Sequence, residues 1–280
     1  MNISTINTVV GMQSIQQKID TIANNISNIN TIGYKSREVF FHDILSGRIQ
    51  QPNEFQQENR LTPSGLNQMG GAKTAMTLAS FLQGQSIQTG IATDVMLLGN
   101  DLFFKVQPSG STDTFGEDAY RYTRDGHFQI DGSRYLVTDQ GDYVLNADDE
   151  PIQIPVGATF QIDSMGRITF QYPDGESEEY GSIGLTQMKD TQALENVGGN
   201  QYQIPSAIIE SGINFAQMID MEDPENQSRY QIVQGSLENS NVDLAKEMTA
   251  LTEAQRAYQF MARGLSINEQ MMGITNNLRG

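Results

Sequence analysis

The sequence predicts a mainly β fold, in which an antiparallel central domain is inserted between long N- and C-terminal α-helices. Two observations support this: both ends of the 280-residue chain carry seven-residue apolar repeats, and the middle alternates short apolar runs with turn residues. We expect the terminal helices to pair as a coiled-coil-like core. The predicted segments are an N-terminal helix at 1–35, an extended connector at 36–93, a β-domain at 94–230 and a C-terminal helix at 231–280.

The N-terminal repeat has apolar side chains at alternating spacings of three and four residues. Its members are Met12, Ile15, Ile19, Ile22, Ile26 and Ile29. This spacing is typical of the a/d seam of a coiled coil. Gly33 can adopt the left-handed conformation that stops a helix, so the helix is predicted to end there. The candidate assembly-core residues of this helix are Ile15, Ile19, Ile22 and Ile26.

The C-terminal repeat has the same period. Leu244, Leu251, Tyr258, Leu265 and Met272 are seven apart, Met248 and Ala262 add intervening positions, and Gln255 and Glu269 interrupt them. Asn239-Ser240-Asn241 are good N-cap residue types, and the helix is predicted to run to about Asn277. The candidate assembly-core residues here are Leu244, Met248, Leu251, Tyr258 and Leu265.

The residue composition of the middle of the chain changes twice. Residues 40–93 are rich in Gln, Asn, Gly, Thr and Ser, which indicates an extended or loop-rich connector. Short strand-like runs follow at 102–106, 120–123, 127–130, 135–138 and 142–145. The pairs Asp125-Gly126, Asp131-Gly132, Gly141-Asp142 and Asp174-Gly175 mark turns, where glycine is expected to supply the positive φ of tight hairpins. This pattern predicts an antiparallel β-domain.

The net charge of −17 is concentrated in the middle of the chain. Residues 1–93 carry +1, residues 94–225 carry −18 and residues 226–280 carry zero. Nearly neutral ends can pack against copies of themselves, whereas a strongly acidic middle favours solvent. The balance argues against a nucleic-acid partner, which needs a basic surface. The N-terminus lacks the pattern of a cleaved secretory leader, and no apolar run is long enough to predict membrane insertion.

No catalytic, cofactor-binding or metal-binding residues are predicted. The chain has no cysteine, its two histidines (His42 and His127) are interpreted as surface or packing residues, and it has no common catalytic motif. A calcium site at the Asp-Gly pairs and a glycosidase carboxylate pair are weaker alternatives. Arg121 and Arg124 lie among carboxylates, and we expect them to form surface ion pairs of little energetic weight.

Three separated motifs resemble one family. Residues 23–35, ANNISNINTIGYK, are similar to the ANNxxNxxTxGYK signature of flagellar rod and hook proteins, matched here by Asn24, Asn25, Asn28, Gly33, Tyr34 and Lys35. Residues 122–128, YTRDGHF, resemble the family's YTRDGxF hairpin. Residues 234–243, QGSLENSNVD, resemble QGxxExSNV, and they are followed by a QRAY segment that contains Gln255 and Arg256.

The resemblance implies a structural subunit of the bacterial flagellar basal body and no enzymatic activity. Members of this family are exported by the flagellar type III apparatus and stack helically, with copies of themselves and beside other rod and hook proteins, into a hollow tube that transmits torque. Their terminal helices form the inner core and their β-domain faces outward. Total length and the segment around Thr62-Pro63-Ser64-Gly65 are similar to the members that form the distal rod.

Three alternatives stay open. The chain could be a proximal-rod or hook protein of the same family, a secreted carbohydrate-active β-domain with oligomerisation helices, or a coiled-coil adhesin.

Overall fold

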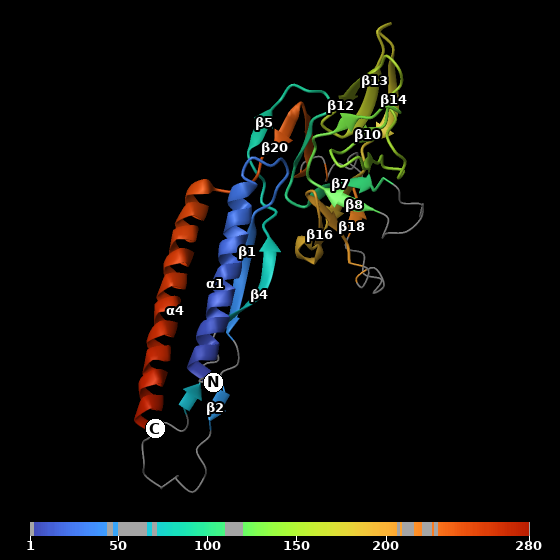
Figure 1. The fold of residues 1–280 in the computed structure, drawn as a ribbon. Coiled ribbons are helices and arrows are strands. Elements are labelled where there is room, and N and C mark those ends of the chain that lie inside the picture. Colours follow the sequence, from blue (N-terminus) through green and yellow to red (C-terminus); the bar gives the residue numbers. More distant parts are fainter. Residues whose placement is uncertain are drawn as a thin grey trace. The chain divides into compact units, whose positions relative to one another are not determined.

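The computed structural model describes residues 3–43, 47–49, 66–68, 72–109, 120–205, 208, 216–219, 226 and 229–279. The chain folds as two units (Figure 1). Unit 1 comprises Met1–Ser27, Arg37–Ala79 and Asp243–Gly280, and unit 2 comprises Asn28–Ser36 and Ser80–Val242.

Unit 1 is built from two long helices and antiparallel ribbons. The helices are α1 (Ile3–Ser27) and α4 (Leu244–Arg279). The ribbons pair β1 (Arg37–Asp43) with β4 (Ala72–Ala79), and β2 (Gly47–Ile49) with β3 (Leu66–Gln68). α1 lies beside α4 and also contacts β1 and β4, so it has neighbours on two sides (Figure 1).

The helix boundaries differ from the predicted ones at two points. α1 ends at Ser27, so the prediction of a helix running to Gly33 was wrong, although Gly33 does have a left-handed φ of 68°. α4 begins just after Asp243, whose Oδ1 accepts hydrogen bonds from the N–H groups of Ala245 at 2.9 Å and Lys246 at 3.3 Å. Asp243 is therefore the N-cap, in place of the predicted Asn239-Ser240-Asn241.

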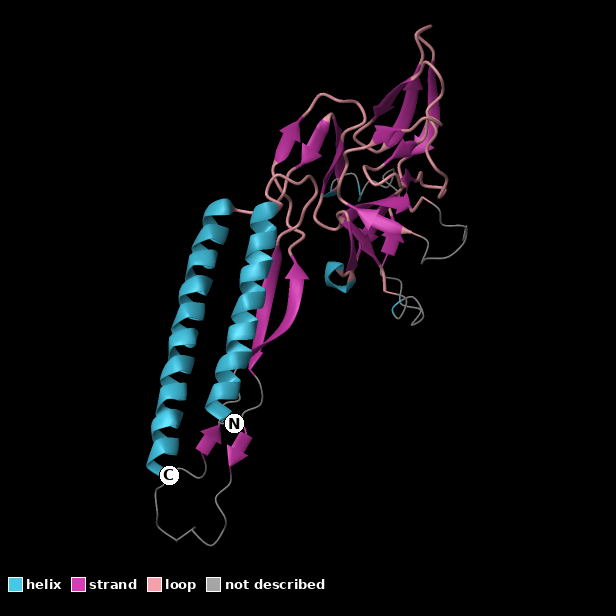
Figure 2. Cartoon of the chain, viewed as in Figure 1, coloured by secondary structure: helices cyan, strands magenta, loops and turns pink. Residues whose placement is uncertain are grey.

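Unit 2 is antiparallel β throughout its paired strands, which confirms the predicted class (Figure 2). Its strands are β5 (Ser86–Gln88), β6 (Val95–Leu98), β7 (Leu102–Gln107), β8 (Arg121–Thr123), β9 (Gln129–Ile130), β10 (Leu136–Val137), β11 (Tyr143–Val144), β12 (Thr159–Ile162), β13 (Arg167–Gln171), β14 (Ser177–Ser182), β15 (Leu185–Met188), β16 (Glu195–Gly198), β17 (Gln201–Gln203), β18 (Ala216–Met218), β19 (Gln231–Gln234) and β20 (Ser236–Glu238). A 3-10 turn spans Thr191–Ala193.

The strands form one large sheet and several small ones. The large sheet has the order β16-β17-β8-β7-β11-β10-β9, with β15 pairing both β7 and β18. β12, β13 and β14 form a three-stranded sheet, while β19 pairs with β6 and β20 pairs with β5. The last two pairings join the C-terminal motif region to segments that precede the large sheet.

The hydrophobic core of the described residues lies in unit 2. β7 is buried along almost its whole length, because its apolar residues from Leu102 to Val106 meet neighbours on both faces. β12 and β13 instead alternate, with Phe160, Ile162, Ile168 and Phe170 pointing inward. Alternation is what a sheet with one solvated face requires.

Only some of the predicted turn glycines lie in hairpin turns with the expected positive φ. Gly141 and Gly175, both at φ 83°, connect paired strands as predicted. Asp125-Gly126 is not a hairpin turn, because β8 pairs with β7 and β17 while β9 pairs with β10. A Cβ on Gly126 would lie 1.7 Å from the Val95 carbonyl oxygen, so glycine serves close backbone approach there. At the Asp131-Gly132 turn, the positive φ belongs to Arg134 at 71°.

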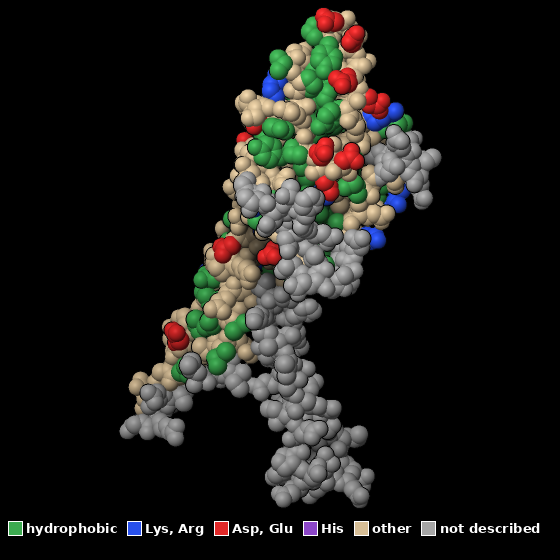
Figure 3. Space-filling model, turned by 90° about the vertical axis from the view of Figure 1, so that its right-hand side faces the viewer, with side chains coloured by type: hydrophobic (Ala, Val, Ile, Leu, Met, Phe, Trp, Pro, Cys, Tyr) green, Lys and Arg blue, Asp and Glu red, His purple; other side chains and the backbone are tan. Residues whose placement is uncertain are grey.

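Many acidic side chains of unit 2 are exposed. The exposed ones include Asp148, Glu150, Asp163, Asp174, Glu176, Glu178, Glu179, Asp190 and Glu195. Figure 3 shows acidic side chains in red on one face of the molecule. No helix among the described residues is long and apolar enough to cross a membrane.

Candidate assembly surfaces and a buried ion cluster

The nine predicted assembly-core residues fall into three classes of exposure in the single chain. Ile22 is buried, while Leu244 and Met248 are 46% and 52% exposed. The remaining six are partly buried: Ile15, Ile19, Ile26, Leu251, Tyr258 and Leu265. In the single chain, two residues of this predicted set are therefore largely exposed, and six more expose part of their surface.

The buried strip of α1 is displaced from the predicted seam. It runs through Gly11, Ser14, Ile22 and Asn25, of which only Ile22 belongs to the a/d pattern. The displacement follows from the two neighbours of α1, since α4 and the β1–β4 ribbon cover different sides of it. A Cβ on Gly11 would lie 3.3 Å from the sulfur of Met261, so this glycine allows a close approach of α4.

Asn25 ties three elements of unit 1 together. Its amide nitrogen donates to the carbonyl of Arg37 at 2.9 Å and to Glu247 Oε1 at 3.2 Å, and its amide oxygen accepts the N–H of Arg37 at 3.0 Å. Asn25 is 1% exposed. This one side chain thus joins α1 to the start of β1 and to the first turn of α4.

Asn24 and Asn28 each form a hydrogen bond with a residue nearby in the sequence. Asn24 donates to the carbonyl of Asp20 at 2.9 Å, within its own helix. Asn28 belongs to unit 2, where its side-chain oxygen accepts the hydroxyl of Thr31 at 3.1 Å and its carbonyl accepts the N–H of Thr31 at 3.1 Å. Gln255 and Arg256 are exposed on α4.

Unit 1 exposes large apolar side chains on both helices and on the β1–β4 ribbon. Phe260 is the extreme case, with 79% of its surface exposed. The others include Ile6, Val9, Phe40, Phe41, Met76, Ile267, Met271, Met272 and Ile274. These exposed side chains are candidates for contacts with other molecules.

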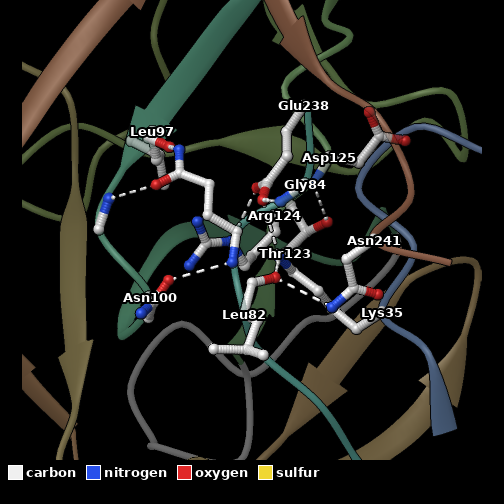
Figure 4. Close-up of polar contacts among 12 residues, drawn as sticks. Lys35, Leu82, Gly84, Leu97, Asn100, Thr123, Arg124, Asp125, Glu238 and Asn241 are labelled. Atoms are coloured by element: carbon white, nitrogen blue, oxygen red, sulfur yellow. Dashed lines mark hydrogen bonds and ion pairs between the residues drawn. The ribbon is translucent and has the colours of Figure 1, made fainter. Parts of the chain in front are cut away.

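A buried ion cluster in unit 2 joins all three sequence motifs (Figure 4). Lys35 Nζ lies 2.7 Å from Glu238 Oε1, and Arg124 Nε lies 3.1 Å from Glu238 Oε2. The side chains of Lys35 and Arg124 are 0% exposed, and that of Glu238 is 2% exposed. The cluster therefore fixes residues from positions 35, 124 and 238 at one place.

Backbone groups complete the surroundings of the cluster. Lys35 Nζ also donates to the Leu82 carbonyl at 2.8 Å, and Glu238 Oε1 accepts the N–H of Gly84 at 2.8 Å. Asn241 receives the N–H of Ser36 at 2.7 Å and donates to the carbonyls of Ser80 and Leu82 at 2.8 and 3.0 Å. These bonds hold together the chain segments that precede and follow the crossings into unit 1.

Gly33 and Tyr34 pack beside this cluster. The N–H of Gly33 donates to the Glu238 carbonyl at 2.8 Å, and Tyr34 is buried. A Cβ on Gly33 would lie 2.7 Å from the backbone nitrogen of Asp125. Gly33 thus meets two requirements at once, a left-handed φ and a close backbone contact.

The cluster holds more positive than negative charge. The pKa of Lys35 is lowered to about 8, because burial and then the nearby Arg124 disfavour its charged form more than Glu238 favours it. Among the described residues, Nη1 and Nη2 of Arg124 have no hydrogen-bond partner. The Arg124 guanidinium lies 5.7 Å from the centroid of the Phe103 ring.

The expectation that Arg124 forms a surface ion pair was wrong. Its guanidinium is buried, because the backbone bonds around Gly33 and Glu238 enclose it in the junction of the three motifs. Sequence reasoning also missed Glu238 as a charged partner. The available signal was that each of the three motifs contains one of these charges, at Lys35, Arg124 and Glu238. Arg121 is one-third exposed and lies 3.8 Å from Asp142.

A second polar group surrounds His127. Its Nδ1 lies 2.8 Å from Asp94 Oδ1, and its backbone N–H donates to Asp125 Oδ1 at 2.9 Å. Burial raises the pKa of the Asp125 carboxyl to about 6, against the lowering effect of the His127 backbone N–H. The side chain of His42 lies outside the described part of the structure. Within the described residues, no group of three potential ligands is placed to hold a metal ion.

Comparison with known protein families gives three matches along the chain. Residues 7–35 match the family of flagella basal body rod proteins, residues 99–170 match the D1 domain of the flagellar hook protein FlgE/F/G, and residues 233–278 match the C-terminal region of the flagellar basal body rod FlgEFG proteins. The order of these matches is that of the three sequence motifs.

Curated relatives match over almost the whole chain. The flagellar basal-body rod protein FlgG of Borreliella burgdorferi is 34% identical over 271 residues, covering 96% of each chain. The flagellar hook-basal body complex protein FlhP of Bacillus subtilis is 30% identical, with 96% of each chain covered, and FlgG of the same organism is 28% identical, with 97% covered. These relatives are named as structural flagellar proteins and not as enzymes. The chain therefore belongs to the flagellar basal-body rod and hook protein family, as a structural rod protein of the FlgG, distal-rod type.

Proposed function

We propose that this chain polymerises helically into the hollow distal rod of the flagellum, where repeated contacts between subunits transmit torque from the motor to the hook. The observation that carries this proposal is the apolar surface of unit 1. Both of its helices expose large hydrophobic side chains, led by Phe260 at 79%. Packing against neighbouring copies would remove that surface from water, which stabilises an assembly by about 25 cal/mol per Å² buried.

The distribution of charge supports the same arrangement. Unit 1 contains nine basic and nine acidic residues, whereas unit 2 contains eight basic and 25 acidic residues. A neutral unit can pack against its copies without net repulsion. We assign the axial core to the terminal helices, pairing in a coiled-coil-like manner, and the outward-facing position to the β-domain.

The assembly core would be built from apolar side chains of α1 and α4. We assign to it Ile15, Ile19, Ile22, Ile26, Leu244, Met248, Leu251, Tyr258 and Leu265. All of them except the buried Ile22 are partly exposed in the single chain, which fits contacts made between subunits. Because each contact recurs in every subunit, the loss of one apolar side chain is multiplied along the polymer.

Family membership supports assembly with other rod and hook proteins in the basal body. We further propose that the chain reaches this place through the flagellar type III export apparatus. This route is what membership of the basal-body rod family implies.

Deletion of the gene in its native host tests the proposal. Electron microscopy of purified basal bodies should show truncated rods without hooks, swimming should be lost, and the intact gene should restore both. Complete rods that lack a hook would assign the chain to the hook, and rods that stop at an earlier point would assign it to the proximal rod. Normal flagella and normal swimming would contradict an axial role.

A further inference from the structure

Unit 1 contains an open hollow between α1, β1 and α4. Its volume is about 260 Å³, and its lining includes Lys18 and Ile22 of α1, Arg37 and Val39 of β1, and Ala250 of α4. All of these residues belong to unit 1, so the hollow is a feature of one folded unit. Its volume is far larger than the roughly 30 Å³ share of a water molecule and below the roughly 300 Å³ at which small-molecule sites begin. A single protein side chain with some water fits such a space.

Two cations that line the hollow have no carboxylate partner. The side-chain nitrogens of Lys18 and Arg37 form no hydrogen bond or ion pair within the described part of the chain. The other charged groups of the lining are already engaged: Lys246 Nζ lies 3.0 Å from Glu38 Oε1, and Glu247 Oε1 accepts a hydrogen bond from an amide group of α1 at 3.2 Å. The hollow therefore presents two positive charges that another molecule can match.

The floor of the hollow is apolar. Ile22 is 5% exposed, and Val39 and Ala250 are partly buried. Burial also raises the pKa of the Glu247 carboxyl in the wall, against the lowering effects of the Asn25 hydrogen bond and of Lys246. An inorganic anion would leave the apolar floor uncovered. A glutamate side chain instead covers it with methylene groups and brings a carboxylate to the cations.

The second requirement of such a contact is a free carboxylate elsewhere in unit 1. A polymer that grows without closing into a ring joins two different surfaces of each subunit, so the carboxylate must lie away from the hollow. Among the described side chains of unit 1, Glu253 and Glu269 are exposed carboxylates without a hydrogen bond or an ion pair. At 1.5 Å per residue, Glu253 lies about 10 Å along α4 from Lys246, and Glu269 about 35 Å. Glu269 alone is thus at the opposite end of the helix, where Ile267 is 57% exposed.

We propose that the hollow of one subunit receives Glu269 from α4 of a second copy, with its carboxylate at Lys18 and Arg37 and its methylene groups over Ile22. This contact rests on the proposed polymerisation and specifies one way in which successive subunits are joined end to end. It matches an unpaired carboxylate at one end of unit 1 with unpaired cations at the other. Because the two surfaces differ, the same contact repeats along an open polymer.

Exchange of the two charges tests the contact in a deletion strain that expresses each variant. Glu269→Lys and Arg37→Glu should each lose most swimming and give shortened rods in electron micrographs, because each places like charges together. The double variant should regain swimming. Glu253→Lys is the matched control, with the same charge change at an exposed, unpaired position of α4, and it should swim normally.

The outcomes separate this contact from the proposed function. Normal swimming of both single variants, or single defects that the double variant does not correct, would overturn the contact while a non-motile deletion strain still supports a rod subunit. A deletion strain with normal flagella would instead contradict the rod function itself. Urea unfolding of each purified variant checks that the exchanges leave the monomer folded.

Cross-linking gives an independent test that leaves the proposed charges unchanged. The chain has no cysteine, so Thr21→Cys in the lining of the hollow and Gln270→Cys beside Glu269 introduce the reactive thiols. Thr21 shares the lining with Ala250, which is about 30 Å along α4 from Gln270, so a short bismaleimide cannot join the two thiols within one chain. Basal bodies of the double variant should give a ladder of cross-linked subunits, and each single variant should give monomers. Monomers alone from a double variant that swims would contradict the contact.

Discussion

The two units of the chain differ in their net charge and in the number of apolar side chains that they bury. Unit 2 carries the whole net charge of −17, and its core contains fully buried residues such as Phe104, Leu136 and Ile168. Unit 1 is neutral, and its described buried apolar side chains are Ile22 and Ala254. Unit 2 therefore contains most of the described buried apolar core, whereas the proposed assembly would bury apolar surface that unit 1 exposes in the single chain.

Their polar interiors differ in the same sense. Unit 2 contains a fully buried ion cluster, which holds distant parts of the sequence at fixed positions. Among the described residues of unit 1, Lys246 and Glu38 form an ion pair at 3.0 Å, and their side chains are 70% and 54% exposed. The buried ion cluster thus lies in unit 2, whereas in unit 1 the buried polar tie is the uncharged side chain of Asn25.

The largest effect should come from replacing the same residue type in the two units. Phe170→Ala in the core of unit 2 should lower the free energy of unfolding by about 3–5 kcal/mol, because it leaves a cavity where the ring contacted Phe160 and Tyr180. Phe260→Ala should change it by less than about 0.5 kcal/mol in the monomer but impair swimming. Urea unfolding and a motility assay measure the two outcomes. Equal losses of monomer stability would remove the contrast between the units.

Glu238→Gln should lower the free energy of unfolding nearly as much as Phe170→Ala. It leaves Lys35 and Arg124 buried without their counter-charge, and breaking a buried pair in this way costs about 3–5 kcal/mol. Glu179→Gln is the matched control, since Glu179 is 63% exposed and lies 4.0 Å from Arg167. Urea unfolding should separate the two variants clearly. Similar stability of both would show that the cluster does not hold the junction.

Much of the contrast between the helices of unit 1 and the strands of unit 2 could be predicted from the sequence, because it depends on local patterns. Alternating apolar runs located β7 to β11, and the seven-residue repeats located α1 and α4. The heptad pattern could not predict which residues of α1 are buried, because the buried face of this helix also depends on a second neighbour, the β1–β4 ribbon. The end of α1 at Ser27 was missed for a related reason: the Asn28–Ser36 segment belongs to unit 2, where long-range bonds hold it.

The ion cluster was not predicted, although each of the three sequence motifs contains one of its charged residues. Arg124 lies in an acidic stretch, which favours the interpretation of a surface pair, and its partner Glu238 is 114 residues away. Only the fold brings the two together. Whether the candidate assembly residues form an axial core remains a prediction from the heptad spacing, because their proposed partners are other subunits.

Lys35 should make unit 2 more stable at alkaline pH. Its pKa is about 8 in the folded chain against an ordinary value of 10.5, so the folded form releases its proton first. The free energy of unfolding should therefore rise between about pH 8 and 10.5, by up to about 3 kcal/mol from this group, and should be insensitive to it at lower pH. Lys35→Met should lack this rise when urea unfolding is followed across the range. An identical pH profile for both proteins would be inconsistent with a desolvated, charged Lys35.

The smallest effect should come from the exposed pair in unit 1. Lys246→Ala removes the contact with Glu38 and should lower monomer stability by no more than about 1 kcal/mol, because exposed pairs are screened by solvent. Glu38→Ala should behave alike, and high salt should reduce both effects. A loss as large as that of Glu238→Gln would mean that unit 1 depends on its own polar contacts.

Hydrogen exchange of the full-length chain, compared between the purified monomer and assembled basal bodies, tests the central contrast most directly. In the monomer, the amides of β7, β13 and the other core strands should exchange slowly, while those of α1 and α4 should exchange much faster. In the assembled rod, both helices should become as protected as the β-domain. Helices that are already fully protected in the monomer, or that gain no protection on assembly, would contradict the account.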